Sequence, residues 1–164
     1  MRIRLIALTA VLLALIGAAS PAQASKKTVI GSEGQRLMAT QTTGLKDGQI
    51  VKVTGTKYNK KVGIYVAFCE LPKQGKLPTN CAGGVNIDAE SSSSFWISDN
   101  PPEYAQGLTK KFTTRGGFIV NLKVSRYIGK TDCAVKKCAI LTRADHTRTA
   151  YRKADVVIPV SFKK

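Results

Sequence analysis

Four cysteines in two short-range pairs constrain the fold of this chain more than any other feature of its sequence. Cys69 and Cys81 enclose residues 70–80, and Cys133 and Cys138 enclose residues 134–137. Four cysteines permit three pairings, and arithmetic alone does not choose among them. Local pairing is favoured because both intervening segments are short and rich in turn-forming residues. The chain-entropy relation gives about 3 kcal/mol for closing the longer loop and about 2 kcal/mol for the shorter one.

The N-terminus has the three parts of a secretion signal. Arg2 and Arg4 precede an apolar run at residues 5–19, and the small-residue site Ala22–Ala24 follows. A membrane anchor is the alternative, but spanning a bilayer takes about 20 apolar residues. We therefore expect residues 1–24 to be removed, leaving a secreted protein, extracellular or associated with the cell surface, with no transmembrane segment. Its compartment would be oxidising, and without Cys-x2-Cys or a second histidine we expect no metal site.

The chain is strongly basic. It holds 26 Lys and Arg against 10 Asp and Glu, a formal net charge of +16, which becomes +14 once Arg2 and Arg4 are removed. Such a charge favours attraction to polyanions, whether DNA, anionic cell-wall polymers or lipid headgroups. The cations are scattered along the sequence and are not gathered on one helix. A solvated basic surface is therefore the simpler interpretation, and a selected polyanion-binding face is the alternative.

Alternation of apolar and polar residues predicts β-strands. At residues 118–125, Phe118, Val120, Leu122 and Val124 alternate with a mostly polar set, and residues 156–163 repeat the pattern. Pro159 lacks a backbone N–H, which places that last strand at an edge or a bulge. Shorter candidate strands lie at residues 37–42, 50–54, 62–69, 84–88, 94–98 and 137–142.

No stretch of the chain has a sustained helical period. About seven or eight short strands, separated by Gly, Asn, Asp and Pro, predict an all-β fold, an immunoglobulin-like antiparallel β-sandwich. We expect one domain at residues 37–164, preceded by the signal peptide and by a linker at residues 25–36.

Several segments carry a family resemblance. They are residues 44–55 (GLKDGQIVKVTG), 65–69 (YVAFC), 80–82 (NCA), 129–138 (GKTDCAVKKC) and 157–162 (VIPVSF). Together they resemble the neocarzinostatin family, secreted actinomycete apoproteins that carry enediyne chromophores. The resemblance implies a seven-stranded sandwich with disulfides Cys69–Cys81 and Cys133–Cys138.

Other positions depart from the chromophore carriers. Those proteins place an aromatic ring two residues after the first cysteine, where this chain has Leu71, and small or polar residues where it has Arg143. They also tend to be acidic. These departures argue against carriage of an enediyne chromophore. The chain is also similar to family members without a chromophore, some of which accompany haem-uptake systems, so a haem-associated surface protein is an alternative.

The resemblance also implies a ligand cleft beside the two disulfide hairpins. The residues expected there are Leu71, Trp96, Tyr104, Leu141, Arg143 and His146. Apolar and aromatic walls with one cationic end suit an amphipathic ligand that bears a carboxylate or phosphate. For Trp96 we expect a packing role rather than a stacking platform, with Phe95 pointing to the opposite side.

His146 is the only histidine of the chain. It could ligate haem iron with Tyr104 or Tyr151, but its polar neighbours favour a hydrogen-bonded or solvated loop histidine. No motif positions a serine or cysteine beside it as a nucleophile, so we expect no enzymatic activity and no cofactor. The sequence therefore predicts a monomeric binding protein for a small apolar or amphipathic ligand. A basic antimicrobial or DNA-binding role is the alternative.

Overall fold

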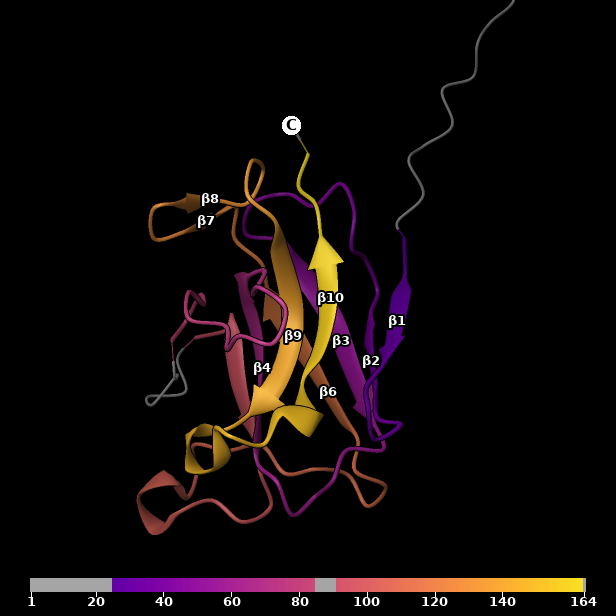
Figure 1. Ribbon diagram of the computed structural model, residues 1–164, viewed down its shortest axis with the longest axis vertical. Coiled ribbons are helices and arrows are strands. Elements are labelled where there is room, and N and C mark those ends of the chain that lie inside the picture. Colours follow the sequence, from indigo (N-terminus) through magenta and orange to yellow (C-terminus); the bar gives the residue numbers. More distant parts are fainter. Residues whose placement is uncertain (1–24, 85–90, 164) are drawn as a thin grey trace, which may run out of the picture.

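The computed structural model describes residues 25–84 and 91–163 (Figure 1). The expected signal peptide lies outside the described residues, as does most of the candidate strand at 84–88. Within them, no helix is long and apolar enough to cross a membrane.

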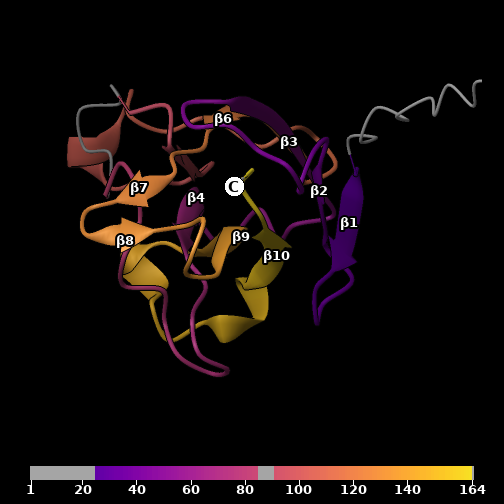
Figure 2. The same cartoon turned by 90° about the horizontal axis from the view of Figure 1, so that it is seen from above.

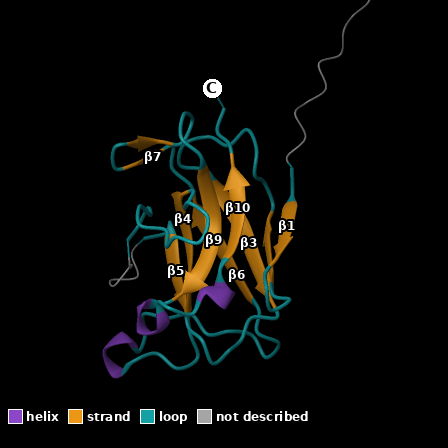
Figure 3. Cartoon of the chain, viewed as in Figure 1, coloured by secondary structure: helices purple, strands orange, loops and turns teal. Residues whose placement is uncertain are grey.

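The described residues form ten strands. They are β1 (Lys27–Ile30), β2 (Arg36–Ala39), β3 (Ile50–Thr56), β4 (Ile64–Glu70), β5 (Ser94–Ile97), β6 (Phe118–Lys123), β7 (Tyr127–Ile128), β8 (Thr131–Asp132), β9 (Cys138–Ala144) and β10 (Val156–Val160). Three single-turn 3-10 helices, η1 (Glu103–Ala105), η2 (His146–Arg148) and η3 (Arg152–Ala154), lie at one end of the molecule (Figure 3).

Eight of these strands form two facing sheets. One sheet has the order β1-β2-β3-β6 and the other β10-β9-β4-β5, and all their strand pairs are antiparallel. Figure 2 shows them as two layers. The predicted antiparallel β-sandwich is thus confirmed, and Pro159 lies in edge strand β10, as its missing N–H required.

The core lies between the sheets and follows the predicted alternation. In β6, Phe118, Val120 and Leu122 are buried while the residues between them are exposed. Phe68 of β4 is fully buried and meets the ring of Phe162 at 6.0 Å between centroids. The C-terminal tail therefore closes one end of the core.

Two features were not predicted. Residues 27–30, within the segment expected to be a linker, form β1 and pair with β2. Val29 is the one side chain of β1 that packs against the core, too little to produce an alternating pattern. The second feature is the β7–β8 hairpin, in which the guanidinium of Arg126 donates two hydrogen bonds to Asp132, at 2.9 and 2.8 Å.

Both disulfides are local. Cys69 is bonded to Cys81 and Cys133 to Cys138, with Cα–Cα distances of 4.0 and 5.5 Å. This is the pairing that the family resemblance implied. The first bond ties the end of β4 to the far end of the 71–80 loop, and the second closes the turn that leads into β9.

Gly116, a buried glycine in the turn before β6, should tolerate alanine poorly. Its φ is +66°, and an added Cβ would lie 2.1 Å from the carbonyl oxygen of Tyr58. We expect Gly116→Ala to lower the free energy of unfolding by about 3 kcal/mol, from backbone strain and overpacking together. Gly107→Ala is the control, because its φ is also positive but nothing lies within 4 Å; it should cost about 1 kcal/mol. Equal losses in urea unfolding would contradict the steric argument.

Candidate functional site

The site lies on the outer face of the β10-β9-β4-β5 sheet. Strand β4 is buried on both faces: Ile64, Val66 and Phe68 enter the core between the sheets. Tyr65 and Ala67 belong to smaller buried clusters on the other side. Since neighbouring residues of a strand point to opposite faces, β4 supplies the floor of the site.

Register places particular side chains beside this floor. Tyr65 pairs with Trp96 of β5 and with Arg143 of β9, and Ala67 pairs with Ser94 and Leu141. Trp96 is buried against Tyr65, whereas Phe95 packs against the main core, so the two rings point to opposite sides, as expected. The floor thus has two adjacent cross-strand rows. One row holds Trp96, Tyr65 and Arg143, and the next holds Ser94, Ala67 and Leu141.

The 71–80 loop crosses this face and is tied down at three points. Leu71 N donates to the carbonyl of Lys137 at 2.8 Å. Arg143 Nη1 donates to the carbonyl of Pro78 at 3.4 Å, and Arg152 Nη2 to that of Lys76 at 3.0 Å. In Figure 1 the loop passes in front of β9. It leaves open space on both sides.

On the β4–β5 side, this space is a cleft of about 320 Å³. Among the residues that the structure describes, its lining includes no carboxylate and consists of Tyr65, Ala67, Pro78, Thr79, Cys81, Gly84, Ser94, Arg143 and His146. Cys81 brings the Cys69–Cys81 disulfide to the wall of the cleft. The guanidinium of Arg143 supplies positive charge at the same place.

His146 is held between two tyrosines. Its Nδ1 lies 2.5 Å from the Tyr65 hydroxyl and its Nε2 lies 2.5 Å from the Tyr104 hydroxyl. The Trp96 ring meets the imidazole edge to face, with centroids 4.9 Å apart. A neutral imidazole has one donor and one acceptor nitrogen, so one tyrosine donates and the other accepts. Both ring nitrogens are therefore occupied.

Asp145 anchors this cluster. It is 2% exposed, and its Oδ2 accepts from Trp96 Nε1 at 2.9 Å. Its Oδ1 accepts from the backbone N–H and the hydroxyl of Thr147, at 3.0 and 2.6 Å. The carboxylate therefore caps η2 and fixes the neighbouring His146 over the sheet.

Burial is the main cause of the shifted pKa of Tyr65 in the floor of the site. Burial, with the nearby negative charge of Asp145, raises the pKa of Tyr65 to about 12, so its hydroxyl stays protonated at neutral pH. At the rim of the loop, hydrogen bonds from Asn80 and Thr131 hold the pKa of Glu70 below its usual value, which keeps this carboxylate ionised.

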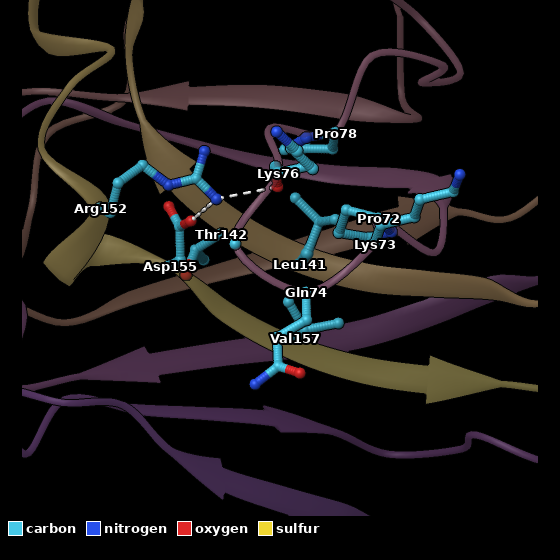
Figure 4. Close-up of a pocket in the computed structure, with 11 residues that line it drawn as sticks. Pro72, Lys73, Gln74, Lys76, Pro78, Leu141, Thr142, Arg152, Asp155 and Val157 are labelled. Carbon is cyan, nitrogen blue, oxygen red and sulfur yellow. Dashed lines mark hydrogen bonds and ion pairs between the residues drawn. The ribbon is translucent and has the colours of Figure 1, made fainter.

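A second groove, of about 390 Å³, lies on the β9–β10 side of the loop (Figure 4). Leu141 and Val157 are among the residues that line it, and Arg152 bridges Asp155 and the Lys76 carbonyl at its end. Burial raises the pKa of Asp155 despite that arginine. The 71–80 loop thus separates two spaces with different linings.

Comparison with known proteins places the chain in a family. The model of the neocarzinostatin family matches residues 37–160. The chain belongs to the neocarzinostatin family. Among solved structures, macromomycin resembles it with a TM-score of 0.51 and 17% sequence identity, over 79% of this chain and 99% of that one, a likeness in fold. No curated protein matches the chain.

The six residues that the neocarzinostatin resemblance assigned to a cleft divide among four places. Arg143 and His146 line the 320 Å³ cleft. Trp96 and Tyr104 contact His146 but are not among the residues that line this cleft. The other two lie elsewhere: Leu141 lines the second groove, and Leu71 lines a third space of about 300 Å³ within the 71–80 loop.

Tyr65, Ala67 and Ser94 were not among the expected site residues of this neocarzinostatin-family chain. Their signal in the sequence was that residues 64–69 are apolar at every position, which is typical of a strand covered on both faces. Tyr151, considered beside His146 as an iron ligand, instead donates to Glu33 at 2.7 Å. Only Tyr104 of that pair meets the histidine.

Proposed function

We propose that this chain is a secreted, non-enzymatic binding protein that holds a small apolar or amphipathic ligand in the cleft beside Cys69–Cys81. The observation that carries the proposal is the described lining of the cleft, in which Tyr65, Ala67 and the disulfide meet the guanidinium of Arg143. Small-ligand carriage is also what membership in the neocarzinostatin family suggests.

The charge of the cleft defines the ligand class further. Arg143 is half-buried, and it uses Nη1 and Nε on backbone carbonyls. Its positive charge, next to apolar walls, favours a ligand with an anionic group at one end and an aromatic or aliphatic body. A volume of about 320 Å³ suits a molecule of drug size or smaller.

Binding is better supported than catalysis. His146, the only histidine, has both ring nitrogens hydrogen-bonded to tyrosine hydroxyls, and all four cysteines are in disulfides. The same hydrogen bonds would have to break before the imidazole could ligate haem iron. Hence neither a nucleophile–base pair nor a histidine-ligated haem has support in this geometry.

Export by a signal peptide at residues 1–24 is part of the proposal. Two disulfides support it, because such bonds persist in oxidising compartments. The protein recovered from culture medium should begin at Ser25 on N-terminal sequencing, whereas recovery of the full chain from the cell would contradict export.

The cleft can be tested with 8-anilinonaphthalene-1-sulfonate, an aromatic anion whose fluorescence rises in apolar surroundings. Arg143→Ala should weaken its binding about tenfold or more, because a charge-assisted contact is lost. Arg143→Lys keeps the charge and should retain most of the affinity. Arg152→Ala is the matched control, since it removes the other loop tether but lies in the second groove. Equal weakening by both alanine variants would overturn the cleft assignment.

A second candidate is polyanion binding, as by a basic antimicrobial or DNA-binding protein. Four ion pairs join the described residues, and they involve Lys60, Arg126, Arg152 and Lys153. Most of the cationic side chains in the described part of the chain therefore lie outside these ion pairs. The two functions separate in a salt series, because polyanion binding weakens steeply with ionic strength and binding of an apolar body does not.

A further inference from the structure

The sheet opposite the cleft has an unusual composition. Its strands β1, β2, β3 and β6 contain no Asp or Glu, although they contain four cationic residues. In Figure 2 this sheet forms one border of the molecule. One side of it packs on the core, and the other side is open to solvent.

Strand register places cations and aliphatic side chains together on the open side. In β3, Val51 and Val53 are buried, so Ile50 and Lys52 face outward. Ile50 pairs with Lys123 across the sheet, and Thr54 pairs with Ile119. Because cross-strand partners have Cβ atoms about 5 Å apart, each of these side chains has close neighbours on the same surface.

The same alternation continues to the other edge of the sheet. Ile30 of β1 pairs with Arg36 of β2, and both are exposed. We call this surface the cationic face, and it comprises Ile30, Arg36, Ile50, Lys52, Ile119 and Lys123. Its three cations form no ion pair with other described residues.

The aliphatic side chains of the cationic face are strongly exposed. Ile30 is 60% exposed, Ile50 53% and Ile119 61%. On the other sheet, by contrast, the 71–80 loop and η1 cover the outward residues, so that Trp96 is only 3% exposed. Single exposed aliphatic side chains are common on protein surfaces, but here three of them share one sheet face with three cations.

Asp47 is a carboxylate near the end of the cationic face, and hydrogen bonds from Arg126 and Ser125, with a smaller effect of the Lys123 charge, lower its pKa. It lies in the loop before β3, and its Oδ1 accepts hydrogen bonds from Ser125 Oγ at 3.1 Å and from the backbone N–H of Arg126 at 2.8 Å. Both hydrogen bonds join Asp47 to the segment that follows β6. The cationic face keeps its net positive charge.

We propose that the cationic face docks on an anionic phospholipid surface. Lysine and arginine near such a surface are attracted to lipid phosphates, while aliphatic side chains enter the boundary between headgroups and acyl chains. A linear polyanion would use the cations but leave the three isoleucines in water. The formal net charge of +14 that remains after removal of Arg2 and Arg4 would draw the whole protein toward the same surface. This inference does not depend on ligand binding in the cleft. It rests on the second candidate function, polyanion binding, and names the protein surface and the partner for it.

Charge reversal tests whether the cationic face is the surface that binds lipid. We would measure co-sedimentation with vesicles of phosphatidylcholine, with and without phosphatidylglycerol. The unaltered protein should bind only the anionic vesicles. Lys52→Glu with Lys123→Glu should weaken that binding by about 25-fold or more, at about fivefold for each cation lost.

Lys111→Glu with Lys130→Glu is the matched control, because both lysines are exposed, lie outside the cationic face and change the net charge equally. It should weaken binding much less. Equal weakening by the two double variants, with thermal unfolding unchanged in both, would show that net charge alone acts and would overturn the proposal.

Insertion of the aliphatic side chains has its own readout. Tryptophan at position 119, as Ile119→Trp, should shift its emission to the blue on anionic vesicles and be quenched by brominated acyl chains. Val135→Trp is the control, at a position 80% exposed on the Cys133–Cys138 turn. No quenching at position 119, or binding to heparin without binding to vesicles, would overturn the lipid proposal and favour a linear polyanion. Neither result would bear on ligand binding in the cleft.

Discussion

Replacing Cys69 and Cys81 together by alanine is expected to lower the free energy of unfolding by about 3 kcal/mol. The bond closes a separation of 12 residues, and its loss returns that loop entropy to the unfolded chain. Cys69 is fully buried, so the two alanines also leave unfilled space. Because Cys81 lines the cleft, binding of 8-anilinonaphthalene-1-sulfonate should weaken as well. Urea unfolding and a fluorescence titration measure the two effects.

The matched variant replaces Cys133 and Cys138. Their separation is 5 residues, so the expected loss is smaller, about 2 kcal/mol. Neither of these cysteines lines the cleft, and ligand affinity should stay close to that of the unaltered protein. The assignment of the cleft would be contradicted if both disulfide variants lost ligand affinity equally at a concentration of urea where both are folded.

Asp145→Ala is expected to be the most damaging single substitution near the site, with a loss of about 3 kcal/mol. It leaves the indole N–H of Trp96 and the backbone N–H of Thr147 without their acceptor in a buried place. The neighbouring His146 would lose its fixed position. Since Trp96 is the only tryptophan of the chain, its emission should shift to the red as water reaches it.

Asp145→Asn separates shape from hydrogen bonding. Its amide keeps one accepting oxygen and nearly the same volume, so it should restore part of the stability that alanine loses. Thermal unfolding and Trp96 emission check both variants. If Asp145→Ala unfolded at the same temperature as the unaltered protein, the buried carboxylate would have no anchoring role.

The fold could be predicted because its signals are local in the sequence. Alternation of apolar and polar residues over 118–125 and 156–163 predicted two strands, each with one buried face. Strands β6 and β10 confirm this prediction. Pro159 predicted that β10 lies at an edge or carries a bulge, for a backbone reason that does not depend on packing, and β10 is an edge strand. Strand β1 was not predicted, because Val29 is its one side chain that packs on the core. A single inward residue gives no recognisable alternation of apolar and polar positions.

The site could be predicted only in part because it is assembled from distant segments. Tyr65 and His146 are 81 residues apart and meet through a hydrogen bond that no local pattern signals. Leu71 and Leu141 were expected in one cleft with His146, but the path of the 71–80 loop assigns them to other spaces. That path depends on Arg143 and Arg152 binding backbone carbonyls, which sequence spacing does not reveal.

The central claim is that a small amphipathic ligand binds beside Cys69–Cys81. The most direct measurement is a two-dimensional ¹H–¹⁵N NMR titration of the protein, disulfides intact, with 8-anilinonaphthalene-1-sulfonate. We predict that the largest shifts fall on residues that line the cleft, among them Ala67, Ser94 and Arg143, and that they saturate together. Shifts that gather on the second groove around Val157, or on β3 and β6, would contradict the claim.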